Sequence, residues 1–177
     1  MDQNLLEDLL NLLSLEKIED GIYRGNSQNL KLPQVFGGQV IGQALSATKD
    51  TLKDKRPVHS FHSYFLRPGD PSRPIVYDVE NLRDGRSIST RRVKAIQHGK
   101  SIFFMTASFH VEANGLEHQA TMPDVVGPED LPSTRERIKK LALEASMPIP
   151  ERFEQQSPIE IRPVESFNPL KLQIQVF

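Results

Sequence analysis

The stretch QVFGGQVIGQALSAT, residues 34–48, decides the fold because it combines a helical hydrophobic pattern with glycines inside that pattern. Its apolar residues recur every three or four positions, which predicts one buried helical face: Val40, Ile41, Ala44, Leu45 and Thr48. Gly38 and Gly42 stand one turn apart, and each glycine inside a helix costs about 1 kcal/mol relative to alanine. We therefore expect a buried helix that approaches another backbone very closely along these glycines.

Downstream of this helix, from Pro57 to Val111, apolar residues recur at every second position, as in strands with one buried face. The last run shows the alternation most clearly: Phe103, Met105, Ala107, Phe109 and Val111. Turn-forming sequences at residues 67–70, 83–86 and 98–100 separate the runs. The pattern predicts four consecutive antiparallel strands behind the long helix, which is an α+β architecture.

Two shorter elements are expected upstream of the long helix. Leucines recur at helical spacing between Leu5 and Leu13, with acidic residues on the other face. They predict an amphipathic helix that packs on the rest of the domain, since helices that lie on membranes usually carry Lys and Arg on the polar face. Residues 16–25 read as one short strand that ends in a glycine turn.

The composition changes after Glu112, where prolines interrupt the chain repeatedly. One helix is expected between them, at residues 133–145, with Ser133 as its N-cap and Glu136 completing a capping box. An alternating apolar run then extends from Leu172 to Phe177. We expect a first domain in residues 1–112, a proline-rich linker with a helix in 113–170, and the start of a second domain in 171–177.

Composition excludes several classes of function. The 177 residues are 37% hydrophobic and 25% charged, an ordinary balance for a globular protein. The net charge of −1, with 22 basic and 23 acidic residues, gives no reason to expect a nucleic-acid partner. The absence of cysteine rules out disulfides, thiolate metal sites and a cysteine nucleophile. The first residues carry acids and no basic segment, so we expect a cytoplasmic protein without a membrane partner.

Several motifs in register resemble the acyl-CoA thioesterase II family: FGGQVIGQAL at residues 36–45, HSFHSYFLRPGD at 59–70, LRDGRS at 82–87, TASF at 106–109 and RPVE at 162–165. The resemblance implies the hotdog fold, an antiparallel sheet wrapped around a central helix, as the first half of a double hotdog. It also implies hydrolysis of fatty acyl-CoA to free fatty acid and coenzyme A, without a metal or another cofactor. In this family an Asp/Thr/Gln set in the second hotdog domain activates the water. This sequence ends where that domain begins, so the resemblance assigns no catalytic residue to this chain.

Candidate substrate-binding residues follow from the chemistry of a thioester and of coenzyme A phosphates. The helix start at Gly37, Gly38 and Gln39 offers N–H groups to an anionic oxygen, although close packing alone could also explain the glycines. Arg83 and Arg86 flank a turn and are candidate phosphate contacts, whereas the neighbouring arginines are expected to be mostly solvated. His59 is a further candidate, on the strand face opposite His62. No residue spacing indicates a metal site.

The central helix offers no Asp, Glu or His as a general base, and its Ser46 reads as a hydroxyl that bonds a backbone carbonyl. Three functions therefore stay open. The first is an acyl-CoA thioesterase represented by its first hotdog, and the second is a non-catalytic acyl-CoA-binding and dimerisation module. The third, a CoA-linked hydratase, ranks last because it needs a His with a carboxylate. Unpaired sheet edges also predict a homo-oligomer, at least a dimer.

Overall fold

The computed structural model describes residues 3–149 and 157–165. The chain forms two compact units, one made of Leu6–Leu116 and the other of the chain from Glu117 onwards with the first five residues. The strand expected at residues 172–177 lies outside the described residues. The proposed domain boundaries at 112 and 170 stay a prediction.

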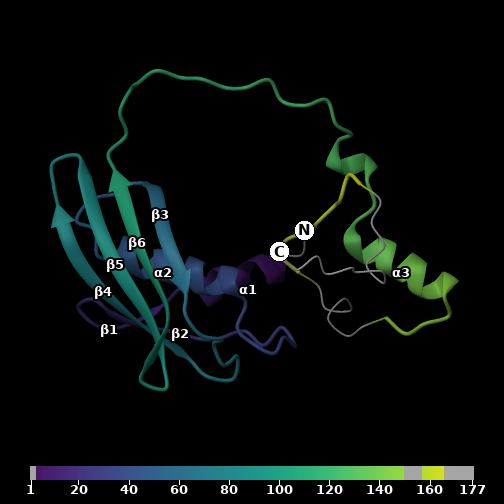
Figure 1. The fold of residues 1–177 in the computed structure, drawn as a ribbon, viewed down its shortest axis with the longest axis horizontal. Coiled ribbons are helices and arrows are strands. Elements are labelled where there is room, and N and C mark those ends of the chain that lie inside the picture. The colour runs from purple at the N-terminus through teal and green to yellow at the C-terminus, as the bar shows by residue number, and fades with distance from the viewer. Residues whose placement is uncertain (1–2, 150–156, 166–177) are drawn as a thin grey trace. The chain divides into compact units, whose positions relative to one another are not determined.

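The larger unit is a six-stranded antiparallel sheet with a long helix across one face (Figure 1). Its helices are α1 (Gln3–Leu13), of which residues from Leu6 onwards belong to this unit, and α2 (Gly37–Asp50). Its strands are β1 (Glu16–Glu19), β2 (Ile22–Gly25), β3 (Val58–Phe65), β4 (Ile75–Asp84), β5 (Ile88–Gln97) and β6 (Lys100–His110). The expected α+β architecture is confirmed, as are both upstream and central helices and the four strands after residue 57.

The order of the strands, β1-β2-β4-β5-β6-β3, differs from the sequence-based expectation in two places. Residues 16–25 form a hairpin of two strands, because Gly21 turns the chain with a φ of +78°. Consecutive strands are also not all neighbours: β3 pairs with β6 and forms an edge of the sheet. Leu66 and Arg67 donate backbone hydrogen bonds to the carbonyl of Ile102, and the chain then crosses to β4 on the far side. Alternating hydrophobicity identifies strands and their faces, but it carries no information about which strands pair.

Helix α2 contacts the sheet through small and polar residues rather than through its glycines. Its buried positions are Gln39, Val40, Gln43, Ala44, Ala47 and Thr48. A Cβ atom built on Gly42 would lie 2.8 Å from Cδ2 of Leu13 in α1, and one on Gly38 would meet the ring of Phe36. The expected close approach of the glycines to another backbone was therefore wrong, since both positions face side chains.

A buried hydrogen-bond network centred on Gln43 ties α2 to its surroundings. The Gln43 side chain is fully buried, and its Nε2 donates to the carbonyls of Leu12 (2.7 Å) and Asn26 (2.8 Å). Its Oε1 accepts a hydrogen bond of 2.8 Å from the hydroxyl of Tyr77 in β4. Burial raises the pKa of Tyr77, so this hydroxyl stays protonated and remains a donor. One amide thus connects α1, the segment after β2, and the centre of the sheet.

The network gives Gly25 a structural role that its sequence position does not reveal. A Cβ atom on Gly25 would lie 2.8 Å from the Cδ, Nε2 and Oε1 atoms of Gln43, whose hydrogen bonds hold it in place. We expect Gly25→Ala to lower the free energy of unfolding by about 2 kcal/mol through overpacking, measured by urea denaturation. Gly42→Ala is the matched control: its methyl group meets only the end of the Leu13 side chain, and helix propensity favours alanine. Equal stability of the two variants would contradict this role.

Two β-bulges change the faces on which functional candidates lie. Val58 pairs with Phe109 and Ser60 with Ser108, so His59 is an extra residue in β3. Leu82 is likewise an extra residue in β4, because Asn81 pairs with Arg91 and Arg83 with Thr90. An extra residue reverses the alternation of side chains beyond it. His59 and His62 therefore share the sheet face away from α2, which corrects the expectation of opposite faces.

The smaller unit contains the expected linker helix, α3 (Thr134–Glu144), after a short 3₁₀ turn, η1 (Pro128–Asp130). The predicted capping box is present: the Ser133 hydroxyl accepts from the N–H of Glu136, and Glu136 accepts from the N–H of Ser133. These hydrogen bonds hold the pKa of Glu136 below its usual range. Arg137 donates to the carbonyls of Pro163 and Glu165, which ties residues 157–165 to this helix.

Candidate functional site

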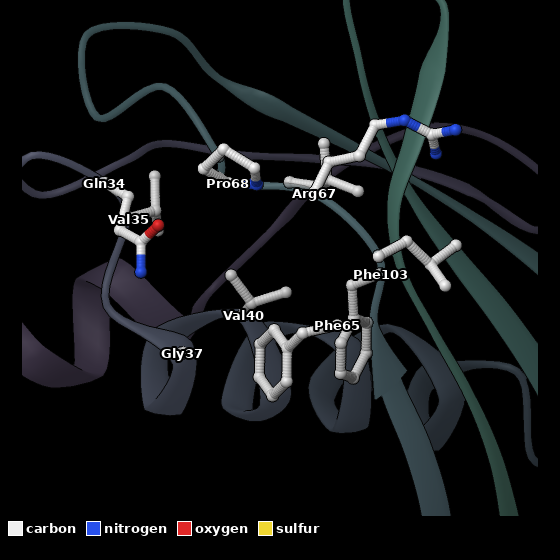
Figure 2. Close-up of a pocket in the computed structure, with 11 residues that line it drawn as sticks. Gln34, Val35, Gly37, Val40, Phe65, Arg67, Pro68 and Phe103 are labelled. Carbon is white, nitrogen blue, oxygen red and sulfur yellow. The ribbon is translucent and has the colours of Figure 1, made fainter. Parts of the chain in front are cut away.

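A mostly apolar pocket of about 450 Å³ opens at the amino-terminal end of α2, where the chain leaves β3 (Figure 2). Three segments form it: residues 34–40, residues 65–69 and the start of β6. Its apolar side chains are Val35, Val40, Phe65, Leu66, Pro68, Ile102 and Phe103. Phe103 belongs to the buried core, whereas Phe65 is 55% exposed. The pocket thus extends the hydrophobic core to the surface of the unit.

The start of α2 supplies the polar part of this pocket. Phe36 is the N-cap residue, and its side chain makes no capping hydrogen bond. The N–H groups of Gly37 and Gly38 lie in the first turn, where no intrahelical carbonyl can reach them. Gly37 lines the pocket, and a Cβ atom there would lie 3.0 Å from Cζ of Phe65. The helix start and its positive dipole end are therefore suited to an anionic or polarised oxygen beside an apolar group.

Arg67 is the only charged residue among the described residues that line the pocket. Its Nη1 donates a hydrogen bond of 2.6 Å to the carbonyl of Ser101 in β6. Figure 2 shows the guanidinium turned away from Gly37 and Val40. The lining residues include no aspartate, glutamate or histidine, so the pocket as described contains no general base.

The six candidate binding residues do not form one site. Gly37 lines the pocket, whereas Gly38 faces Phe36. Gln39 is buried and joins the core network: its Nε2 donates to the carbonyl of Asn26, and its Oε1 accepts from the N–H of Gln28. A binding role for Gly38 and Gln39 stays a prediction without direct geometric support.

His59 lies on the outer sheet face. Its Nε2 is 2.9 Å from the hydroxyl oxygen of Ser108, and its ring meets His110 edge-on at 5.8 Å. The rest of the sheet separates His59 from the pocket, which opens on the α2 side. Among the described residues, no group of three or more His, Cys, Asp or Glu side chains is arranged to hold a metal ion.

Arg83 and Arg86 lie at the opposite end of α2, about 21 Å from its start for a helix of 14 residues. At that end of α2, Arg91 joins the helix to the sheet. The sequence suggested that this arginine was solvated, but its side chain is fully buried. Its Nε donates to the Thr51 hydroxyl, and its Nη2 donates to Asp84 Oδ1 at 2.7 Å. The Leu82 bulge places Asp84 on the same sheet face as the Arg91 side chain. The hydrogen bond from Arg91 holds the pKa of Asp84 below its usual range.

Sequence reasoning missed the two residues that shape the pocket. Phe65 was interpreted as part of an alternating strand, and Arg67 as the start of a turn and one of several arginines expected to be mostly solvated. The available signal was the position of Arg67-Pro68-Gly69 immediately after an apolar strand, since loops that follow strands often carry binding residues. Its proximity to the start of α2 depends on the β3–β6 pairing, which the sequence did not predict.

Comparison with known proteins identifies the family. Residues 29–110 match the family model described as the acyl-CoA thioesterase N-terminal domain. Over 166 residues, 94% of this chain, the sequence is 49% identical to acyl-CoA thioesterase 2 of Haemophilus influenzae. The chain is similar to acyl-CoA thioesterases of type II over most of its length. The resemblance carried by the FGGQVIGQAL and HSFHSYFLRPGD motifs is thereby confirmed.

Solved structures extend the comparison from the sequence of this chain to its fold. It is 45% identical to acyl-CoA thioesterase II TesB2 of Mycobacterium marinum, with a TM-score of 0.64 over 73% of this chain and 49% of that one. A hot dog fold protein of Alicyclobacillus acidocaldarius is 22% identical, with a TM-score of 0.64 over 71% of this chain and 48% of that one. The hotdog fold expected from the sequence is confirmed.

The chain spans only part of the length of the relatives that it matches. It covers 58% of the length of the Haemophilus protein and about half of the Mycobacterium marinum chain. Within the residues that the structure describes, no helix is both long and apolar enough to cross a membrane.

Proposed function

We propose that this chain is the first hotdog domain, with its linker, of an enzyme that hydrolyses fatty acyl-CoA to free fatty acid and coenzyme A. The pocket at the start of α2 is the observation that carries the proposal. It places apolar side chains for an acyl group beside helix-terminal N–H groups, which can stabilise an oxyanion on the thioester carbonyl. The reaction uses water and needs no metal or prosthetic group.

The residues around the pocket indicate which part of the reaction this chain supports. Because no carboxylate or imidazole among the described residues lines it, we infer that the water is activated by residues outside this pocket. We infer that the Asp/Thr/Gln set of a second hotdog domain supplies them. The contribution of this chain is then to bind the substrate and to complete the fold.

The experiment that tests the function is hydrolysis of a long-chain acyl-CoA by the gene product extended to the length of its relatives. Release of the coenzyme A thiol is followed with a thiol-reactive dye. We expect steady turnover, and we expect Arg67→Gln or Phe65→Ala in that protein to raise KM. An extended protein that binds acyl-CoA without releasing thiol would contradict the proposal.

The second candidate is a non-catalytic acyl-CoA-binding and dimerisation module. The lack of a base in the described pocket favours it for the chain taken alone. The two candidates differ in one measurable respect: only the first predicts catalysis by a protein extended to the length of the relatives. In either case a cytoplasmic location stays part of the proposal.

The exposed edge of the sheet predicts self-association. Strand β3 is an edge strand, and its aromatic side chains Phe61, Tyr64 and Phe65 are 46%, 53% and 55% exposed. Exposed edges with apolar side chains recruit further strands. We expect the chain to sediment as a dimer or larger assembly, with two copies imitating the pairing of a double hotdog.

Phe61→Lys should shift this equilibrium towards the monomer, because it places a charge on the β3 edge. Val76→Lys is the matched control, since it introduces the same charge on an exposed position of β4, inside the sheet. Sedimentation velocity of the wild type and both variants decides the matter. A wild-type monomer at high concentration would contradict the predicted assembly.

A further inference from the structure

Two loops at the carboxyl-terminal end of α2 form a basic cluster, which we define as Lys53, Lys55, Arg83 and Arg86. The first pair lies in the segment between α2 and β3, and the second lies at the turn between β4 and β5. The loops are in direct contact, because Arg56 Nη1 donates a hydrogen bond of 2.9 Å to the carbonyl of Gly85. All four side chains of the cluster belong to exposed residues.

The acidic residues of these loops are already neutralised by other arginines. Asp54 is bound to Arg56 through two hydrogen bonds, of 2.6 and 2.9 Å. Asp84 is bound at 2.7 Å to Arg91, whose side chain has no solvent exposure. Lys53 lies close enough to contribute to the lowered pKa of Asp84. Among the described residues, none of the four cluster side chains forms an ion pair of its own, so four positive charges remain uncompensated.

This local excess of charge stands out in a chain whose net charge is −1. Two exposed cations of β5 are paired by contrast, Arg92 with Glu80 and Lys94 with Asp78. Four neighbouring cations repel one another, and the buried Arg91 and the Arg56 hydrogen bonds hold the loops together against that repulsion. A rigid set of exposed cations without acids is suited to a ligand with several phosphate charges.

We propose that the basic cluster binds the phosphate groups at the nucleotide end of coenzyme A. This inference rests on the proposed function, which makes a coenzyme A thioester the substrate. The arginine guanidinium groups can bind phosphate oxygens in bidentate fashion, while the two lysines add point charges.

The geometry also indicates how one ligand could use both the cluster and the pocket. Strand β3 begins two residues after Arg56 and ends at the pocket residue Phe65. Its eight residues therefore separate the basic cluster from the pocket by about 27 Å within one chain. An antiparallel pair of β3 edges would place the cluster of one hotdog beside the pocket of the other. A coenzyme A molecule could then place its thioester in one half and its phosphates on the other.

The test is calorimetric titration of the chain with adenosine 3′,5′-bisphosphate at low ionic strength. Two double variants, Arg83→Gln/Arg86→Gln and Lys53→Gln/Lys55→Gln, should each weaken binding by about tenfold for every phosphate-binding cation that is replaced. Lys100→Gln/Lys140→Gln is the matched control, because it removes the same charge from exposed positions elsewhere and should leave affinity unchanged. Thermal melting verifies that all variants are folded.

The proposal would be overturned by no binding to the wild type, by equal affinity in cluster and control variants, or by equally tight binding of inorganic pyrophosphate. Adenosine, which carries no phosphate, should not bind, and binding as tight as that of the bisphosphate would also overturn it. Retained bisphosphate binding in an extended protein that fails to hydrolyse acyl-CoA would support the cluster while contradicting the proposed function. The two proposals can therefore fail separately.

Discussion

The isolated chain is expected to hydrolyse acyl-CoA at least about 100-fold more slowly, in kcat/KM, than the same protein extended to the length of its relatives. The pocket offers apolar contacts and helix-terminal N–H groups, which keep part of the transition-state stabilisation. Its described lining lacks a residue that can take a proton from water, and general-base catalysis contributes about 10²–10⁴-fold. The measurement is thiol release by both proteins under identical conditions.

Ser46→Ala is the control within the short chain. Ser46 is the only hydroxyl in the apolar stretch of α2 before Thr48, and it is half-buried. If the Ser46 hydroxyl takes no part in the residual hydrolysis, the variant should retain the same low rate. A short chain as fast as the extended protein, and inactivated by Ser46→Ala or by another change within residues 1–177, would show that this hotdog has its own catalytic residues.

The largest loss of stability is expected from Gln43→Leu. Leucine has a similar size but leaves the Leu12 carbonyl and the Tyr77 hydroxyl without their Gln43 partner. The Asn26 carbonyl loses one of its two hydrogen bonds and keeps the one from Gln39. Each buried polar group that loses its hydrogen bond costs about 1–3 kcal/mol. Allowing for relaxation at the edge of the network, we expect a loss of about 3–5 kcal/mol, measured by urea denaturation.

Gln119→Leu is the matched control, because the same change occurs at an exposed position, where the amide bonds only the neighbouring Ala120 carbonyl. Its effect should lie within about 0.5 kcal/mol of the wild type. Tyr77→Phe removes one partner of Gln43 and should give an intermediate loss. A fully stable Gln43→Leu protein would show that water or another group replaces the amide.

The sequence predicted the elements that depend on periodicity. The helix at residues 37–50, the alternating faces of β4 and β6 and the capping box at Ser133 and Glu136 all followed from local spacing. These features were predictable because each is determined by residues a few positions apart. The motifs, taken together, also predicted the family.

Features determined by residues distant in sequence were not predictable in this way. Gln43 and Arg91 are fully buried although their residue types favour the surface, because each is satisfied by partners from other elements. The pairing of β3 with β6 moved Phe65 and Arg67 to the start of α2, and thereby formed a pocket from residues that had been assigned to a strand and a turn.

The extra residue Leu82 in β4 has a consequence for comparing this chain with its relatives. Residues on the two sides of the bulge follow opposite alternation, and Asp84 reaches Arg91 only because of the added position. In a homologue without the bulge, an ungapped alignment would place an outward-facing side chain opposite Asp84. An aspartate in the alignment column of Asp84 would then not face the counterpart of Arg91. The residue that corresponds to Asp84 in space would stand one column away. Evolutionary couplings between residues 84 and 91 should therefore be calculated only from sequences that share this insertion.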